Sequence, residues 1–298
     1  MKVLITGGSG QLGTYLQRTK PANIEVIVPL SAELNLADFD SINEYLNNVN
    51  IDAIINAGAY TAVDLAEVES DQAYAVNAAG VQTLVAYCKL ERIPLVHIST
   101  DFVFDGRSSN PYTPDDQCNP LSVYGASKLA GEKYALAFDE AYVVRTGWVY
   151  GQYGGNFVKT MLRLASEKDA VGVVADQIGT PTYAQNLALA IWAIILKRPL
   201  SRLFHFSDAG VASWYDFAYA IFEAGLKQGL IESMPKLSAV TSADFPTPAQ
   251  RPKYSVLDKS LIWSELDIEP VYWRRALEQM LERLKTVEGS PIDDARNV

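Results

Sequence analysis

The sequence predicts an α/β fold in which a doubly wound parallel sheet is followed by a smaller α/β lobe. Two observations lead to this prediction. Short apolar runs alternate with helix-compatible segments through the first half of the 298 residues, and these runs are nearly continuous in Val, Ile and Leu. Strands that are joined through helices are parallel, and parallel strands are apolar throughout because helices cover both faces of their sheet.

The expected strands of the first half lie at 2–6, 24–28, 53–56, 94–99 and 142–145. The helices expected between and beyond them lie at 12–19, 39–47, 63–90, 122–137, 157–166, 183–197, 213–225 and 271–285. Glycine and proline become more frequent after residue 151, and 242–252, with three prolines, is expected to be an ordered loop or extended segment. We therefore predict one domain over 1–150, a lobe over 151–286 from which some segments return to the first domain, and a flexible tail over 287–298.

The composition excludes several classes of protein. Apolar residues make up 49% and charged residues 20%, which is enough apolar surface to form a core. The net charge of −10 argues against a nucleic-acid polymer or an anionic membrane as a partner. The two cysteines, Cys88 and Cys118, are too few for a disulfide framework. No targeting signal is visible, and the longest apolar stretch, 187–196, is far shorter than a spanning helix, so a cytoplasmic location is expected.

A glycine-rich turn follows the first expected strand. Gly7, Gly10 and Gly13 have the spacing G-x-x-G-x-x-G and lie between a strand and a helix. Glycines let the backbone approach a pyrophosphate closely, and the N–H groups and dipole of the following helix stabilise its charge. An acidic protein can hold a phosphate in this way without many cations. The turn predicts a dinucleotide-binding, Rossmann-type domain over 1–150.

The end of the second strand favours NADPH over NADH. A fold that selects NAD usually has an acidic residue there, which binds the adenosine ribose 2′-hydroxyl. This chain has Leu30 and Ser31 at that place, and its first acid is Glu33. The missing carboxylate removes a repulsion against a 2′-phosphate, and Ser31 could donate a hydrogen bond to one. Because no arginine is nearby, use of NADH is left open.

A tyrosine and a lysine four residues apart predict a reductase site. Tyr124 and Lys128 share one face of the expected helix, and an ammonium near a phenol lowers a pKa that is ordinarily about 10. Thr100 ends the preceding strand, where doubly wound folds place their sites. A tyrosine of this kind can pass its proton to a carbonyl oxygen while a hydride reaches the carbon. His97 and His205 lie in apolar segments and are expected to be core residues with satisfied nitrogens.

Further segments resemble a known family. They are the glycine turn, 56–64, 99–104, 124–128, 145–151, 156–161, 176–182 and 251–255. The glycine turn and the Tyr-x-x-x-Lys pair look like those of extended short-chain dehydrogenases/reductases. The other segments are more specific, and over residues 1 to about 285 the chain resembles the dTDP-4-dehydrorhamnose reductase family.

The resemblance implies an NADPH-dependent oxidoreductase that reduces the 4-keto group of dTDP-4-dehydro-L-rhamnose to dTDP-L-rhamnose, a step in polysaccharide biosynthesis. It implies that Tyr124 is the general acid, that Lys128 tunes it and holds the nicotinamide ribose, and that Thr100 bonds the carbonyl oxygen. The expected cofactor-binding residues are Gly7, Gly10, Gln11, Leu12, Gly13, Asn35, Leu36, Ala59, Tyr60, Thr61, Tyr124 and Lys128. The expected substrate-binding residues are Thr61, Val63, Thr100, Asp101, Phe102, Tyr124, Trp148, Asn156 and Arg251. Of these, Trp148 could instead be a packing residue and Arg251 a member of a surface ion pair.

The chain departs from the family's pattern at Asn35, Gly147 and Gln250, where aspartate, serine and arginine are usual. Some members dimerise around magnesium through glutamates, one of which lies in the helix after the Gly-x-Pro-Thr motif. That helix begins here with Tyr183, Ala184 and Gln185. A neutral amide is a poorer Mg²⁺ ligand than a carboxylate, so we expect no metal site and leave a role for magnesium and a homodimer open.

Three alternatives differ in what they require of the sequence. A dehydratase on the same scaffold needs a glutamate where this chain has Phe102, and is therefore disfavoured. A reductase of a related dTDP-4-ketohexose stays open, because the sequence does not reveal the stereochemistry of the product. A non-catalytic regulatory subunit, like the similar one of methionine adenosyltransferase, also stays open, although Thr100, Tyr124 and Lys128 are intact.

Overall fold

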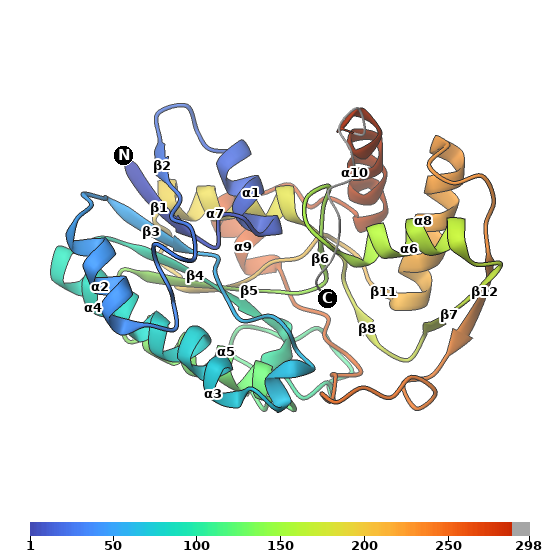
Figure 1. Cartoon of the computed structure of the whole chain (residues 1–298), viewed down its shortest axis with the longest axis horizontal. Coiled ribbons are helices and arrows are strands. Elements are labelled where there is room, and N and C mark those ends of the chain that lie inside the picture. The colour runs from blue at the N-terminus through green and yellow to red at the C-terminus, as the bar shows by residue number, and fades with distance from the viewer. Residues whose placement is uncertain (288–298) are drawn as a thin grey trace.

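The larger part of the molecule is a six-stranded sheet, in which the strands have the order β2-β1-β3-β4-β5-β10 and every neighbouring pair is parallel (Figure 1). The computed structural model describes residues 1–287, so the predicted tail lies outside the described residues from residue 288 on. The strands are β1 (Lys2–Thr6), β2 (Glu25–Ile27), β3 (Ala53–Asn56), β4 (Leu95–Thr100), β5 (Ala141–Thr146) and β10 (Leu203–His205). The predicted fold class is confirmed.

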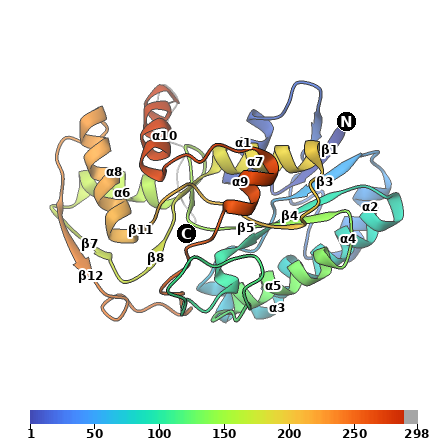
Figure 2. The ribbon, with the colours of Figure 1, turned by 180° about the vertical axis from the view of Figure 1, so that it is seen from behind.

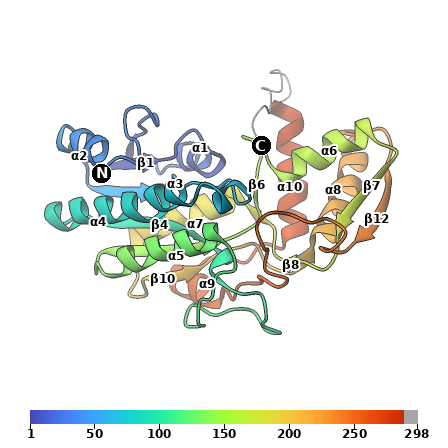
Figure 3. The ribbon, with the colours of Figure 1, turned by 60° about the horizontal axis from the view of Figure 1, so that its bottom comes forward.

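Helices cover both faces of this sheet, as Figures 1 and 3 show. One face carries α1 (Gln11–Arg18), α7 (Ala184–Lys197) and α9 (Ser260–Leu266), and the other carries α2 (Phe39–Asn47), α3 (Ser70–Tyr74), α4 (Gly80–Glu91) and α5 (Val123–Leu136). Val3 and Ile5 pack on the first side, whereas Leu4 between them packs on the second. Both sides of β1, β3, β4 and β5 are therefore buried, which explains the continuous apolar runs, whereas the edge strand β2 is partly exposed.

The order of the strands places a crevice between β1 and β3. The chain runs from β1 outward to β2 and then crosses back to β3 on the other side of β1. The connections that leave β1 and β3 consequently diverge, and in open α/β sheets ligands bind at such a point, beyond the carboxyl ends of the strands.

A smaller lobe lies beside the carboxyl ends of the sheet (Figures 1 and 2). Its helices are α6 (Phe157–Glu167), α8 (Trp214–Gln228) and α10 (Trp273–Val287). Its short strands pair as β6 (Val149–Tyr150) with β9 (Thr182–Tyr183), β7 (Ala170–Val174) with β12 (Lys236–Val240), and β8 (Ile178–Gly179) with β11 (Ala212–Ser213). Three segments beyond residue 151, namely α7, β10 and α9, lie on the large sheet. The Trp192 indole of α7 donates to the Leu16 carbonyl of α1 at 3.1 Å.

The predicted helix over 63–90 is interrupted, so that prediction was wrong in its continuity. A 3₁₀ turn (Leu65–Glu67), α3 and a π-helical turn (Ala75–Ala79) precede α4. The π turn directs Asn77 inward, where its amide bonds both backbone polar groups of Tyr60 and the Ser127 hydroxyl. Such turns occur where a side chain must be re-aimed, and these tertiary bonds have no signature in the local sequence. Sequence analysis also missed α9 and the two-residue strands of the lobe.

The strongly apolar stretch 187–196 lies within α7, where most of its side chains are buried against α1 and the sheet. Across residues 1–287, no helix combines the length and the apolar character needed to cross a membrane.

Close packing of α5 leads to the first prediction. A Cβ at Gly131 would lie 2.1 Å from the Asn77 carbonyl oxygen, which is backbone and cannot move freely. Gly131→Ala should therefore lower the free energy of unfolding by about 2 kcal/mol, measured by urea denaturation. Gly172→Ala is the control, since its Cβ would meet only side-chain atoms, at 3.3 Å or more, and it should be nearly neutral. Equal stability of the two variants would contradict this packing.

Candidate active site

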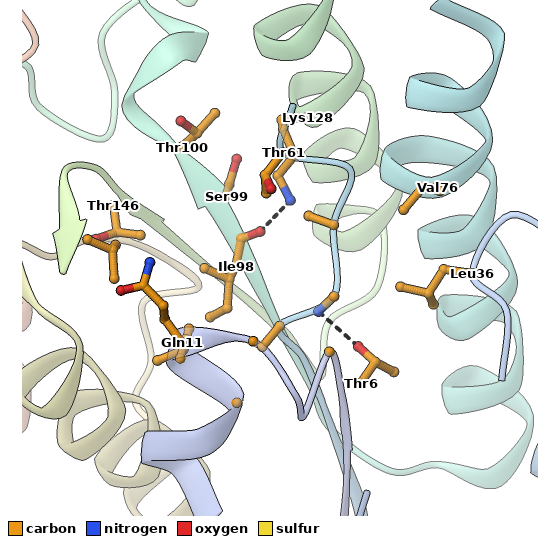
Figure 4. A pocket seen from close by; sticks show the side chains of 18 of the residues that line it. Thr6, Gln11, Leu36, Thr61, Val76, Ile98, Ser99, Thr100, Lys128 and Thr146 are labelled. Atoms are coloured by element: carbon orange, nitrogen blue, oxygen red, sulfur yellow. Dashed lines mark hydrogen bonds between the residues drawn. The ribbon is translucent and has the colours of Figure 1, made fainter. Parts of the chain in front are cut away.

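A cavity of about 610 Å³ lies at the crevice, beyond the carboxyl ends of β1, β3, β4 and β5 (Figure 4). It extends from the glycine turn at one end to Thr100 and Trp148 at the other. This volume is in the usual range for sites that enclose a small molecule. The predicted residues that line it are Gly7, Gly10, Gln11, Leu12, Gly13, Asn35, Leu36, Ala59, Thr61, Val63, Thr100, Asp101, Phe102, Tyr124, Lys128 and Trp148.

The glycine turn has no room for side chains on its inner side. Gly7 has a φ of +65°, and a Cβ there would lie 2.6 Å from the backbone of Gly58. A Cβ at Gly13 would lie 2.2 Å from the Gly7 carbonyl oxygen. Gly10 precedes α1 and offers no side chain to cap it. The first N–H groups of α1 therefore lie at the cavity and have no side-chain cap within residues 1–287, which suits an anion.

A row of polar side chains joins the glycine turn to β4. Thr6, Asn56 and His97 lie directly opposite one another on three neighbouring strands. The Thr6 hydroxyl donates to Asn56 Oδ1 at 2.6 Å and accepts from the Gly58 N–H at 3.1 Å (Figure 4). The Asn56 amide lies 3.0 Å from His97 Nδ1. These bonds hold the ends of β1 and β3, which border the cavity, in a fixed position relative to β4.

Both histidines are buried core residues, as predicted. His205 has two partners: its Nδ1 lies 3.0 Å from the Tyr112 carbonyl oxygen and its Nε2 lies 3.3 Å from Arg145 Nη1. Burial lowers the pKa of His205 to about 3. The expectation that both nitrogens are satisfied was wrong for His97, because its Nε2 has no hydrogen-bond partner among the described residues. Burial also lowers the pKa of His97 well below its usual value.

In space, the first turn of α5 lies next to the end of β4, and this places Tyr124 at the cavity. Ser122 caps the helix by accepting from the Gly125 N–H at 3.2 Å, and Glu67 accepts from the Val123 N–H at 2.9 Å. A Cβ at Gly125 would lie 2.3 Å from the Phe102 carbonyl oxygen, so only glycine lets the helix start this close to the strand. The Tyr124 ring packs edge-to-face on Phe102.

Lys128 is only 2% exposed, and its Nζ donates to the Ile98 carbonyl oxygen at 2.6 Å (Figure 4). Burial lowers the pKa of Lys128 to about 8. Burial also raises the pKa of Tyr124 to about 12, with a further contribution from the Asp101 charge, and the Thr100 hydroxyl only partly offsets this. The predicted lowering of the tyrosine pKa is therefore wrong for this structure, because desolvation of the phenolate outweighs other effects. Tyr124 is a protonated donor at neutral pH.

Asp101 lies buried behind Thr100, whose hydroxyl donates to Asp101 Oδ1 at 3.1 Å. Burial raises the pKa of this carboxyl to about 6, while the hydroxyls of Ser255 and Thr100 act in the opposite direction. A Cβ at Gly147 would lie 2.5 Å from the carboxyl carbon. The glycine that replaces the family's usual serine thus leaves the space that Asp101 occupies.

Trp148 lines the cavity and also packs. It has a φ of +52°, and its ring stacks on Trp214 with centroids 3.5 Å apart and planes 4° apart. Gly179 lies against the indole, since a Cβ there would be 2.6 Å from its Cε2 atom. The ring is therefore held rigidly where it meets the cavity.

Three predicted residues lie elsewhere. Tyr60 is not among the lining residues, and its hydroxyl donates to Glu69 at 2.8 Å. Asn156 caps α6, and its amide is engaged by Gln11 Oε1, the Gly151 carbonyl and the Lys159 N–H, so it reaches neither described cavity.

Arg251, the third, lines a second cavity of about 460 Å³. There its guanidinium binds the Asp64 carboxylate, with Nη2 and Oδ2 2.8 Å apart, and this lowers the pKa of Asp64. Arg107 and Lys253 line the same cavity. Val63 lines the first cavity, and the next residue, Asp64, binds Arg251 of the second, so this segment connects the two cavities.

Sequence analysis missed a buried ion pair and a buried amide near the site. Glu132 of α5 binds Arg145 of β5, and Asn77 supports the backbone of Tyr60. A signal for Glu132 was present, because it follows Lys128 by four residues and therefore shares its face of the helix. Throughout the part of the chain that is described, no three His, Cys, Asp or Glu side chains are grouped so that they could hold a metal ion. Gln185 accepts instead from Tyr183 and Arg283.

Comparisons with known proteins agree with this geometry. The family model described as the RmlD substrate binding domain matches residues 1–286. A dTDP-4-dehydrorhamnose reductase of Aggregatibacter actinomycetemcomitans is 42% identical over 94% of this chain and 98% of its own length. A crystal structure of a dTDP-4-dehydrorhamnose reductase from Clostridium acetobutylicum has a TM-score of 0.89 and 39% identity, and covers 96% of this chain and 100% of that one. A crystal structure of a Bacillus anthracis dTDP-4-dehydrorhamnose reductase in complex with NADP has a TM-score of 0.89 and 35% identity. The match covers 95% of this chain and 99% of that one.

Burial of the two histidines leads to a second prediction. Because both pKa values lie below the usual range, neither ring should gain a proton between pH 5.5 and pH 8. In NMR spectra, the two imidazole C–H signals should stay constant over this interval. The urea-unfolded chain is the control, in which both should titrate at about pH 6.5. A native histidine signal that moves with a midpoint near that pH would show that its ring is not buried as described.

Proposed function

The chain belongs to the dTDP-4-dehydrorhamnose reductase family, and we propose that it uses NADPH to reduce the 4-keto group of dTDP-4-dehydro-L-rhamnose, giving dTDP-L-rhamnose. The observation that carries this proposal is the position of Thr100, Tyr124 and Lys128 at one end of a cavity whose other end is a glycine turn. A phenol donor thus faces the space where a carbonyl would meet a nicotinamide ring.

The shape of the cavity supports a dinucleotide. Gly7, Gly13 and Gly58 leave a backbone cradle that any Cβ would fill, and the N–H groups of α1 open onto it. Ser31 also lines the cavity, and among residues 1–287 no acidic side chain lines it at that end. This arrangement suits the 2′-phosphate of NADPH. When it is bound, the nicotinamide of NADPH supplies the hydride.

Tyr124 is the proposed proton donor. Its high pKa keeps the phenol protonated, so its O–H can donate to the 4-keto oxygen and transfer the proton as negative charge develops there. The Thr100 hydroxyl turns its hydrogen from Asp101 to the same oxygen and adds a second hydrogen bond. Lys128 provides the positive charge that stabilises the phenolate left behind. Solvent then returns a proton to Tyr124.

The two cavities divide the proposed substrate between them. Val63, Phe102 and Trp148 give the first cavity an apolar wall for the sugar ring. Arg251 is the proposed partner of the diphosphate at the second, where Arg107 and Lys253 add positive charge. The second cavity therefore offers the anionic substrate three cations, of which Arg251 would have to exchange part of its contact with Asp64 for the diphosphate. Asn156 is left out of this proposal, because its amide is already engaged.

The activity is tested directly by NADPH oxidation with dTDP-4-dehydro-L-rhamnose generated from dTDP-glucose by the upstream enzymes, and with NADH in parallel. The product is identified by NMR. We expect turnover to dTDP-L-rhamnose, and faster with NADPH than with NADH. Formation of a different 6-deoxysugar would reassign the substrate or the product stereochemistry. Tight NADPH binding without turnover would favour a regulatory subunit.

The role of Tyr124 is tested by Tyr124→Phe, which keeps the ring and its contact with Phe102 but removes the proton. We expect kcat to fall by roughly 10²-fold or more. Tyr134→Phe on the same helix is the control, since its side chain is exposed and should leave kcat unaltered. Full activity of Tyr124→Phe would mean that another group donates the proton.

A further inference from the structure

A buried ion pair lies one helical turn beyond Lys128. Glu132 is 1% exposed and Arg145 is 4% exposed. Arg145 Nε donates to both carboxylate oxygens at 3.0 and 3.1 Å, and Nη2 donates to Oε2 at 2.8 Å. The carboxylate is therefore held in one orientation by a planar fork.

The two charges of the pair lie at different distances along the chain from Lys128, with the negative one on the same helix. Glu132 is on α5, four residues after Lys128 and on the same face. Arg145 is on β5, and the other side of its guanidinium faces away from α5. There its Nη1 donates to the Pro114 carbonyl oxygen and lies beside His205 Nε2, and the group packs over the Phe104 ring at 5.2 Å. The negative end of the pair is thus the end on the helix of Lys128.

A pair buried this deeply is expensive in stability. Removing two charges from water costs several kcal/mol per ion, and apolar residues of similar volume often serve a fold as well or better. Such a pair is accordingly a candidate for a role other than stability. Lys128 gives it one, because a 2% exposed ammonium whose recorded hydrogen-bond partner is a carbonyl oxygen needs a nearby negative charge.

Glu132 is the titratable group whose charge acts directly on Lys128. Other titratable groups on α5, on β4, directly after β4 and on β5 include Tyr124, His97, Asp101 and Arg145. The phenol is protonated and the imidazole is neutral at pH 7. Asp101 has a pKa raised to about 6, so it is ionised at pH 7 to 8, and its charge acts on Tyr124. Glu132 is the carboxylate that raises the pKa of Lys128 against the effect of burial.

We propose that Glu132, clamped by Arg145, is a positioning residue that keeps the Lys128 ammonium charged inside the active site. The inference rests on the proposed function, since it concerns the lysine that assists proton transfer from Tyr124. Its consequence is a basic limit on activity: above a pH of about 8, Lys128 loses its proton and turnover falls. Without the Glu132 charge, that limit moves to lower pH.

Glu132→Gln tests this, because the amide keeps the shape and one acceptor oxygen for Arg145. The basic limb of the kcat profile should move down by about one pH unit, so that kcat at pH 8 falls to roughly a fifth of the wild-type value. At pH 6 the variant should recover most of its activity. Glu132→Asp, which keeps the charge, should restore the limb toward its wild-type position. Glu140→Gln removes an exposed partner of Arg198 and is the control, with an unchanged profile.

Further measurements separate this inference from a folding defect and from the proposed function. The double variant Glu132→Leu with Arg145→Met leaves no unpaired buried charge, and it should shift the basic limb in the same direction as Glu132→Gln. Titration of Lys128 by ¹³C NMR, without substrate, should give a lower pKa in Glu132→Gln than in the wild type. That result would support the inference even if the wild type failed to reduce the keto sugar. An unshifted Lys128 titration, or a loss of kcat that is equal at every pH, would overturn it.

Discussion

Burial of the Lys128 ammonium is the constraint on which the site depends. A cation that is 2% exposed is tolerated only if its surroundings compensate it, and the compensation comes from the Ile98 carbonyl of β4 and the Glu132 carboxylate of α5. Helix α5 must therefore lie close to the sheet. Gly125 lets α5 begin close to the residues that follow β4, where a Cβ would meet the Phe102 carbonyl oxygen at 2.3 Å. Gly131 lets the helix pack against the π turn, where a Cβ would meet the Asn77 carbonyl oxygen at 2.1 Å. The glycines, the lysine and the ion pair form one packing arrangement.

The same sheet fixes the distance between the two ends of the cavity. Thr6, Asn56 and His97 bridge three strands just below the glycine turn, and β4 continues from His97 to Thr100. A dinucleotide held at the turn would therefore meet the donor groups without any adjustment of the sheet. Pre-organisation of this kind lowers the cost of binding and of orienting the reacting atoms.

The sequence predicted what depends on local pattern. Apolar runs and helix-compatible segments predicted β1, β3 and α2 with their observed bounds, because these elements are determined by burial and by short-range hydrogen bonds such as the Asp38 cap of α2. It could not predict what depends on tertiary contacts. The π turn at Asn77 follows from bonds to Tyr60 and Ser127, and the high pKa of Tyr124 follows from burial. Asn156 and Arg251 matched family motifs equally well, yet only Arg251 lines a described cavity, because helix capping and Gln11 engage Asn156.

The pKa values of Tyr124 and Lys128 are shifted in opposite directions by the same physical cause. Burial penalises the charged form of both, so the phenol keeps its proton more firmly and the ammonium less firmly than in water. If Tyr124 is the proton donor, as we propose, the phenolate that it leaves and the Lys128 ammonium, which is on the same face of α5, stabilise each other. The proposed mechanism then requires that Lys128 is charged at the outset. Glu132 and Arg145 supply that condition from behind the helix, out of reach of any substrate.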